Sequence, residues 1–238
     1  LIQTSQQRLM NNQIKFYQPW SAPILHSSLS EIQIKELLEI TDSISKDENK
    51  ESYNNQLAGE IENEWGISAS IVELNSFKNY IDDLSLKYLT SFASQYNIEN
   101  NKIPPQLVKF AQCLEKSVIT SAWFNDQKDD EYNPIHNHTG ILSGVLYLKI
   151  PEYLPSRKNK DTDGTISFVG NSSDTDKIMT NSTITISPKV GDIFLFPSLL
   201  KHQVYPFRTA DRKGIRRSLS FNKGLAGDQS DSFSLHHS

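Results

Sequence analysis

Hydrophobic residues recur with a helical period in two segments of the first hundred residues. In the first segment, residues 30–33 (Ser-Glu-Ile-Gln) have the form of a capping box, and apolar side chains follow at roughly helical spacing. This pattern predicts a helix over residues 31–45. The next residues, 46–63, are polar and lack periodicity, so we expect them to form an exposed loop.

The second segment carries the longer apolar pattern. From Phe77 to Phe92, aromatic and aliphatic residues keep a spacing of three or four positions, which predicts a helix over residues 75–96. Pro104 and Pro105 bar any continuation of this helix, because proline cannot occupy the interior of a helix without breaking it.

Beyond residue 106 the apolar runs become short, rich in β-branched and aromatic residues, and separated by Gly, Pro, Asn and Asp, as is typical of strands. The predicted strands are Ser117–Phe124, Gly144–Ile150, Thr165–Val169, Thr183–Ser187, Ile193–Phe196, Gln203–Tyr205 and Arg216–Asn222. Short strands at this density favour a sandwich or jelly roll, with the helices packed on one sheet from outside. We therefore expect an α+β protein in which a helical extension (residues 1–105) packs on a β core (residues 106–238), together forming one compact domain.

Composition narrows the class of protein only modestly. A chain of 238 residues with 37% hydrophobic residues can bury a substantial core. The net charge of -4 gives no excess of basic residues, so nucleic acid is not a favoured partner. Cys113 is the only cysteine, which excludes an internal disulfide and favours a reducing compartment, with the cytoplasm as the expected location. The sequence contains no run of 18 apolar residues and begins without the apolar stretch of a signal peptide, so no membrane partner is expected.

Three of the histidines have the spacing of metal ligands. The chain contains His26, His136, His138, His202, His236 and His237. The last two lie in a polar tail, and His26 has no ligand-like neighbours. On an extended backbone, His136 and His138 would point to the same side, because they stand two positions apart. His202 follows the predicted strand that ends near Ser198, and a closed β fold would return it to the other two.

Two ligands close in sequence and a third far away, with coordination positions left open, suit an iron(II) ion that binds a co-substrate and oxygen together. Three histidines also suit zinc, so a cupin-like module that holds a metal without oxygenase activity is a second hypothesis. In a third hypothesis the histidines are structural, and the two predicted helices form a surface for a partner.

Residues 216–222 (RRSLSFN) alternate in character, which distributes them over two faces of a strand. One face carries Arg216, Ser218, Ser220 and Asn222, and the other carries Arg217, Leu219 and Phe221. A polar inward face fits a small dicarboxylate, because an arginine fork and a neighbouring hydroxyl bind carboxylate through charge-assisted hydrogen bonds. The serines favour Arg216 over Arg217 for this role, and a surface arginine pair is the alternative.

The order and spacing of these motifs resemble a family of 2-oxoglutarate- and iron(II)-dependent oxygenases of bacteria and phages, which is distantly similar to prolyl 4-hydroxylases. The motifs that carry the resemblance are His136-x-His138, SGVLYL at residues 143–148, GDIFLFPS at residues 191–198, His202 and RRSLSFN at residues 216–222. The resemblance covers residues 117–222 and implies a double-stranded β-helix (a cupin-like jelly roll). It also implies a dioxygenase, a hydroxylase in kind, that converts 2-oxoglutarate and O2 to succinate and CO2. The oxidised substrate, whether a peptide side chain, an amino acid or a metabolite, is not identified, and neither is the oligomeric state.

The resemblance assigns roles to individual residues and implies no catalytic residue beyond the metal ligands. Fe(II) would be held by His136, His138 and His202. The distal carboxylate of 2-oxoglutarate, the small-molecule co-substrate, would be held by Arg216 with Ser218 and Tyr147. The residues expected to line the pocket are Trp123, Asn125, Ser220 and Asn222.

One position departs from the family pattern. Most such oxygenases have Asp or Glu where His138 stands, and a neutral imidazole leaves the site one unit more positive. An alternative register makes His138 and His202 the only ligands and places Gly140 at the carboxylate position, as in related halogenases. The neighbouring acidic residues are expected to form a solvated loop rather than to supply a replacement ligand; they are Asp126, Asp129, Asp130 and Glu131.

Overall fold

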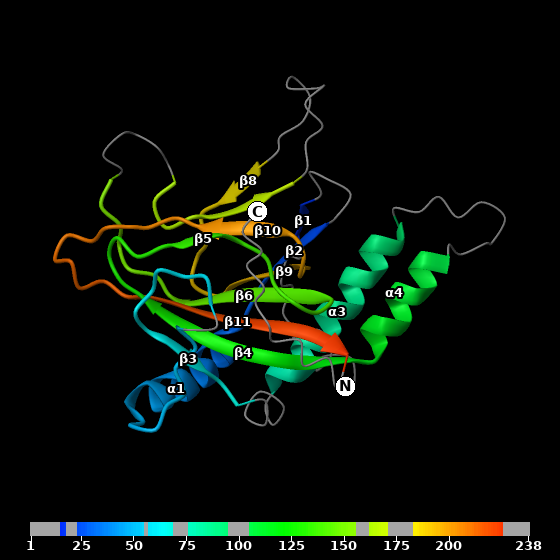
Figure 1. Cartoon of the computed structure of the whole chain (residues 1–238), viewed down its shortest axis with the longest axis horizontal. Helices are drawn as coiled ribbons and strands as arrows, with labels where there is room; N and C mark the ends of the chain where they lie inside the picture. The colour runs from blue at the N-terminus through cyan, green and yellow to red at the C-terminus, as the bar shows by residue number, and fades with distance from the viewer. Residues whose placement is uncertain are drawn as a thin grey trace, which may run out of the picture.

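Two antiparallel sheets face each other in the part of the chain that the computed structural model describes, residues 15–17, 23–54, 57–68, 76–94, 105–155, 162–170 and 183–225 (Figure 1). From edge to edge, the large sheet contains β1 (Lys15–Tyr17), β2 (Ile24–Ser28), β9 (Asp192–Pro197), β6 (Leu142–Lys149), β11 (Arg216–Leu225), β4 (Ser117–Gln127) and β3 (Glu64–Gly66). The small sheet contains β5 (Asn133–His136), β10 (Lys201–Val204), β7 (Ile166–Val169) and β8 (Thr183–Ile186). Each strand predicted from the sequence is present, with its ends shifted by a few residues. The fold is thus mostly antiparallel sheet with few helices.

The helices form where local signals and packing agree. Helix α1 (Glu31–Lys46) begins with a capping box, in which the Gln33 backbone N–H donates to Ser30 Oγ at 3.2 Å and the Ser30 backbone N–H donates to Gln33 Oε1 at 2.9 Å. Helix α3 (Ser76–Ser94) confirms the second predicted helix. Helix α4 (Pro105–Glu115) was not predicted; Pro105 opens it, at a position where the missing N–H has no helical partner to lose. None of the described helices is both long enough and apolar enough to cross a membrane.

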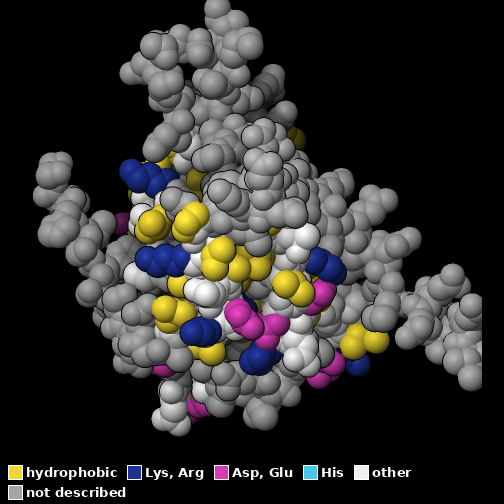
Figure 2. Space-filling model, turned by 90° about the vertical axis from the view of Figure 1, so that its right-hand side faces the viewer, with side chains coloured by type: hydrophobic (Ala, Val, Ile, Leu, Met, Phe, Trp, Pro, Cys, Tyr) yellow, Lys and Arg dark blue, Asp and Glu magenta, His cyan; other side chains and the backbone are white. Residues whose placement is uncertain are grey.

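The large sheet has two differently covered faces. One face packs against the helices through a cluster that includes Leu37, Ile81, Leu84, Phe124 and Leu219. The other face meets the small sheet through aromatic and aliphatic side chains, namely Ile24, Val145, Tyr147, Ile166, Phe168, Phe194 and Phe196. On the outer side of α3 and α4, hydrophobic side chains lie among Lys, Arg, Asp and Glu (Figure 2). The interior between the two sheets is therefore the enclosed part of the fold.

The N-terminal part of the chain contributes strands as well as helices. Strand β2 pairs with β9, β1 adds outside β2, and β3 pairs with β4 at the opposite edge. Helices and a loop were expected here, and these three strands were not predicted. The division at residue 105 into an extension and a core stays a prediction.

Candidate functional site

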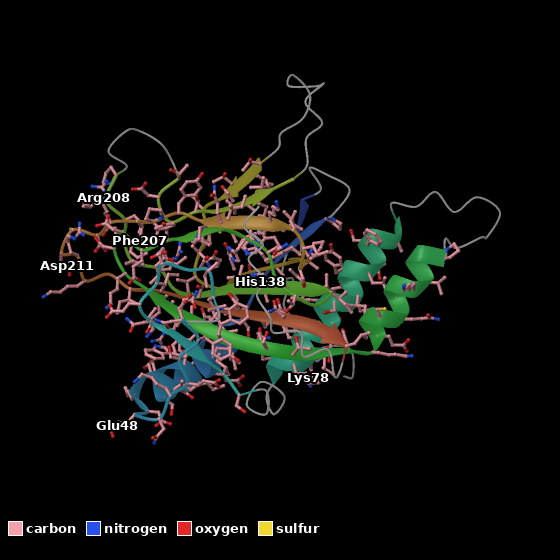
Figure 3. All side chains as sticks on the ribbon, in the orientation of Figure 1. Glu48, Lys78, His138, Phe207, Arg208 and Asp211 are labelled. Carbon is pink, nitrogen blue, oxygen red and sulfur yellow. The ribbon has the colours of Figure 1, made fainter. Side chains whose placement is uncertain are left out.

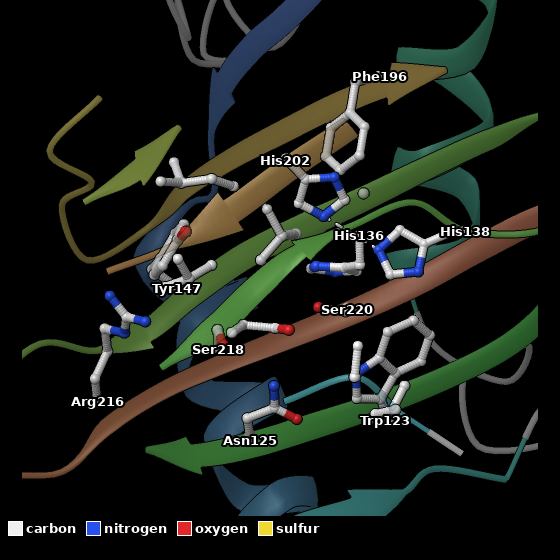
Figure 4. Close-up of a pocket in the computed structure, with 17 residues that line it drawn as sticks. Trp123, Asn125, His136, His138, Tyr147, Phe196, His202, Arg216, Ser218 and Ser220 are labelled. Carbon is white, nitrogen blue, oxygen red and sulfur yellow. Dashed lines mark hydrogen bonds between the residues drawn. The ribbon is translucent and has the colours of Figure 1, made fainter. Parts of the chain in front are cut away.

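The three candidate histidines converge between the two sheets, where His138 lies in the interior (Figure 3). Strands β5 and β10 pair so that His202 stands opposite His136. His138 follows β5, and its backbone N–H donates to the carbonyl of Ser198 at 2.8 Å. One ring nitrogen from each residue lies within 4.8 Å of the other two, and Nε2 of His138 is 3.2 Å from Nε2 of His202 (Figure 4). The fold thus brings together side chains that are 64 positions apart in the sequence.

Backbone carbonyls orient two of the three rings. His136 Nδ1 lies 2.7 Å from the carbonyl oxygen of Pro134, and His202 Nδ1 lies 3.0 Å from that of Leu200. Because a carbonyl oxygen only accepts, each Nδ1 carries the hydrogen and leaves the Nε2 lone pair free for another partner. This is the arrangement that commonly orients histidine ligands of metals.

Burial keeps the imidazoles neutral. Loss of hydration lowers the pKa of His136, and it lowers that of His138 well below the usual value. For His202, burial and then the neighbouring His136 lower the pKa to about 3. A neutral imidazole is the form that binds a metal, so no proton competes at neutral pH.

The donor set fits a first-row transition metal. Two nitrogen ligands at about 2.1 Å from one ion are about 3.0 to 3.4 Å apart for angles between octahedral and tetrahedral. The separation of 3.2 Å between Nε2 of His138 and Nε2 of His202 falls in this interval. Among the described residues, this is the group of three His, Cys, Asp or Glu side chains with ligand spacing.

A pocket extends from the histidines along the inner face of the large sheet (Figure 4). Its lining residues are Leu57, Ala58, Trp123, Asn125, Asn133, His136, His138, Gly144, Val145, Tyr147, Ile166, Phe196, His202, Val204, Arg216, Ser218 and Ser220. All the site residues expected from the sequence are among them except Asn222. The side chain of Asn222 instead accepts from Ser143 Oγ at 2.7 Å and donates to Ser121 Oγ at 3.1 Å, linking neighbouring strands.

The end of the pocket away from the histidines is cationic and contains unpaired donors (Figure 4). Arg216 is 1% exposed, donates from Nη1 to Gly164 O at 2.6 Å, and also donates from Nη2 to Gln127 Oε1. Its Nε has no hydrogen-bond partner, and neither does the hydroxyl of Tyr147, whose pKa is raised by burial. Buried polar groups are normally paired, so these orphaned donors indicate a missing acceptor such as a carboxylate.

Arg217 lies on the opposite face of β11, as the alternation of the sequence predicts. Its guanidinium donates to both carboxylate oxygens of Asp126, at 2.6 and 2.5 Å, and to Asp42 of α1 at 2.5 Å. The two arginines are 1% and 3% exposed, so the alternative of a surface arginine pair is wrong. The expectation that Asp126 lies in a solvated loop is also wrong, because β4 continues to Gln127 and buries it.

Several residues of the site were not predicted from the sequence. Leu57 and Ala58 belong to the segment predicted as an exposed loop, yet they lie half-buried in the pocket wall. Asn133 lies at the start of β5, a strand too short and polar to be predicted. Gln127, which holds Arg216, is identified only by its pairing across the sheet, where it stands opposite Arg216.

The remaining histidines stand apart from the cluster. His26 lies on β2, with Nε2 at 2.9 Å from Asp192 Oδ1 and its ring stacked on Phe194. His236 and His237 lie outside the described residues.

Comparisons with known proteins agree with this geometry. The model of a family described as "Putative 2OG-Fe(II) oxygenase" matches residues 121–222, the segment that contains all the proposed metal-binding and co-substrate residues. No curated protein matches the sequence.

Several solved structures are similar to this chain at low sequence identity. The non-haem α-ketoglutarate-dependent carbocyclase SnoK of nogalamycin biosynthesis is 11% identical, with a TM-score of 0.51 over 85% of this chain and 79% of that chain. A prolyl 4-hydroxylase of Pseudomonas putida is also 11% identical, with a TM-score of 0.48 over 84% of this chain and 92% of that chain. HygX of Streptomyces hygroscopicus, solved with nickel and 2-oxoglutarate, is 9% identical with a TM-score of 0.47 over 86% and 83% of the two chains. Residues 121–222, which contain the histidine cluster, are thus similar to the family of 2OG-Fe(II) oxygenases, enzymes that use Fe(II) and 2-oxoglutarate.

Proposed function

We propose that His136, His138 and His202 hold Fe(II), and that Arg216, Tyr147 and Ser218 hold the distal carboxylate of 2-oxoglutarate in the same pocket. The enzyme would convert 2-oxoglutarate and O2 to succinate and CO2 while hydroxylating a second substrate. One observation carries this proposal: a single pocket has three neutral imidazoles at one end and a buried arginine with unpaired donors at the other (Figure 4).

When bound, the iron and 2-oxoglutarate supply the oxidising chemistry, and the protein orients them and excludes water. The imidazole nitrogens present lone pairs from rings fixed by backbone carbonyls. The guanidinium of Arg216 lies 5.9 Å from the ring centre of Tyr147 and 5.6 Å from that of Phe207, so aromatic rings shield it from water. A charge-assisted hydrogen bond is stronger in such a dry environment.

Three histidines in place of two histidines and a carboxylate change the charge of the centre. With His138 as a ligand, the bound ion keeps its full charge of two until the co-substrate arrives, because no protein ligand is anionic. We expect this to favour the dianionic co-substrate and to alter the redox behaviour of the iron.

We further propose that the two facing sheets are a double-stranded β-helix, the jelly roll of cupin-like oxygenases. The proposal rests on the antiparallel order of β9, β6, β11 and β4 opposite β5, β10 and β7, with the histidines between the sheets. Residues 1–105 would then be an extension that covers the outer face of a core formed by residues 106–238. The lone Cys113 fits the reducing cytoplasm, which also preserves Fe(II).

Anaerobic titration of Fe(II), followed through the charge-transfer band that forms with 2-oxoglutarate, tests the assignment. We expect His136→Ala, His138→Ala and His202→Ala each to reduce iron affinity strongly, because each removes a ligand. His138→Asp should keep an iron site with an altered spectrum, since carboxylate is also an iron ligand. The matched control is His26→Ala, a half-buried histidine on β2 outside the cluster, which should leave the titration unchanged. A silent His136→Ala variant would refute the three-histidine site.

The same titration addresses the two alternatives. In the shifted register, Gly140→Asp would add a ligand and strengthen iron binding. Gly140 has a φ of +94°, and a Cβ there would lie 2.6 Å from the backbone oxygen of Lys223, so we expect that substitution to destabilise the fold instead. A metal-holding module without oxygenase activity would bind iron yet release no succinate from 2-oxoglutarate with any candidate substrate.

A further inference from the structure

The unpaired polar atoms around the pocket divide into two chemical kinds. Near Arg216 they are donors, the Nε of that residue and the hydroxyl of Tyr147. Elsewhere they are the side-chain oxygens of Asn125 and Asn133, which accept, and both carboxyl oxygens of Glu64, which accept when the group is ionised. The donors fit the carboxylate of 2-oxoglutarate. That co-substrate has no hydrogen to donate, so the acceptors require a different partner.

Glu64 belongs to the pocket side of the large sheet. Across the strands, Glu64 of β3 stands opposite Asn125 of β4, which stands opposite Ser218 of β11, which stands opposite Tyr147 of β6. Directly opposite residues of antiparallel strands project to the same face. Asn125, Ser218 and Tyr147 all line the pocket, so the side chain of Glu64 ends the same row.

The loop above the sheet places the carboxyl more closely. A Cβ built on Gly59 would lie 2.9 Å from Glu64 Oε1, so the carboxyl lies directly beneath the backbone of residue 59. The two preceding residues, Leu57 and Ala58, line the pocket. The carboxyl therefore lies directly behind the lining residues, between the backbone of Gly59 and Asn125 on the sheet.

The environment of this carboxyl is unfavourable without a ligand. Glu64 is 0% exposed, and neither oxygen has a partner. Burial, and then the negative charge of Glu131, raise its pKa to about 8. A buried carboxyl of this kind becomes a stable carboxylate only when a cation pairs with it.

Aromatic rings stand beside the acceptors. Gly66, two residues after Glu64, is opposite Trp123, and the ring of Tyr53 is stacked on Trp123 with ring centres 6.4 Å apart. A Cβ on Gly66 would lie 2.5 Å from the Tyr53 ring, so glycine there makes room for the stack. Aromatic faces attract organic cations.

We propose that Glu64, with Asn125 and Asn133, binds the cationic nitrogen of the substrate that this enzyme oxidises, an ammonium or guanidinium group. An ammonium has three donors and a guanidinium five, enough for these acceptors, whereas a neutral hydroxyl has one. The inference rests on the proposed function, because it concerns the second substrate of the same site.

Paired small probes test the charge preference directly. Calorimetry on the protein loaded anaerobically with Fe(II) and 2-oxoglutarate would compare n-butylammonium with n-butanol, and methylguanidinium with methylurea. We expect each cation to bind about tenfold or more tightly than its neutral match. Binding of the cation should release a proton at pH 7, because it converts the Glu64 acid to the carboxylate.

Two variants assign the effect to Glu64. Glu64→Gln keeps the size of the side chain and should remove both the cation preference and the proton release. The matched control is Glu62→Gln, a carboxyl on the same segment whose side chain is 71% exposed and paired with Lys128, and it should behave as the wild type. Equal binding of cation and neutral match in the wild type, or an unchanged preference in Glu64→Gln, would overturn the inference. If the charge-transfer band never forms, the proposed function fails, and the same probes on the metal-free protein still decide the role of Glu64.

Discussion

Replacing the neighbouring arginines of β11 separates co-substrate binding from folding. Arg216 has five N–H groups, of which one reaches Gly164 and one reaches Gln127, leaving three for a carboxylate. Arg216→Ala removes these charge-assisted bonds, and we expect 2-oxoglutarate to bind more weakly by roughly 1.5 to 3 kcal/mol, about 10- to 150-fold in Kd. Arg216→Lys should recover only part of the loss, because an ammonium lacks the planar fork.

Arg217→Ala is the matched control because it truncates the same residue type on the other face. It leaves the buried carboxylate of Asp126 unpaired, so it should reduce the free energy of unfolding by about 3 to 5 kcal/mol. The Kd of 2-oxoglutarate, measured from the charge-transfer band of the folded protein below its unfolding transition, should change little. Urea unfolding of both variants supplies the stability comparison. Equal losses of 2-oxoglutarate affinity in the two variants would refute the assignment of faces on β11.

Two further predictions concern unpaired groups. Tyr147→Phe removes a hydroxyl that has no protein partner, so the free energy of unfolding should be unchanged or higher. In the same titration, 2-oxoglutarate should bind about 0.5 to 1.5 kcal/mol more weakly. An unaltered affinity would exclude this hydroxyl from the carboxylate site. Glu64 has a pKa of about 8 in the folded protein against an ordinary 4.5, so the folded state binds more protons between these values and stability falls as pH rises from about 4.5 to 8. The stability gained in Glu64→Gln, measured by urea unfolding of the metal-free protein at pH 5 and pH 8, should therefore be larger at pH 8, and an equal gain at both would contradict the raised pKa.

Local patterns predicted the parts of the fold that depend on local physics. The capping box at Ser30 and the apolar period from Phe77 each specify a helix through residues close in sequence, and both helices are present. The spacing of His136 and His138 likewise follows from the period of an extended chain. The alternation in residues 216–222 correctly separated the faces of Arg216 and Arg217, because one face of β11 is buried against helices and the other against the pocket.

Features that depend on distant pairing were missed. Strand β3 has three residues and exists because β4 offers it an unpaired edge, which no pattern in the segment Glu64–Gly66 reveals. The burial of Asp126 follows from Arg217, its neighbour across the strands and 91 positions away. Glu64 directly follows the segment predicted to be an exposed loop, residues 46–63, and only the sheet register places it beside the pocket.

Because the histidines come from distant parts of the chain, a bound metal would also stabilise the folded state. An ion held by His138 and His202 would join points 64 residues apart and so cross-link the polypeptide. In the chain-entropy description of cross-links, closing a loop of that length stabilises the folded state by about 4 kcal/mol. The strands fastened in this way, β5 and β10, have four residues each. Bound iron would thus stabilise the small sheet in addition to acting as a cofactor. Removal of the iron by a chelator should therefore speed amide hydrogen exchange in β5 and β10 before it affects β4 and β11.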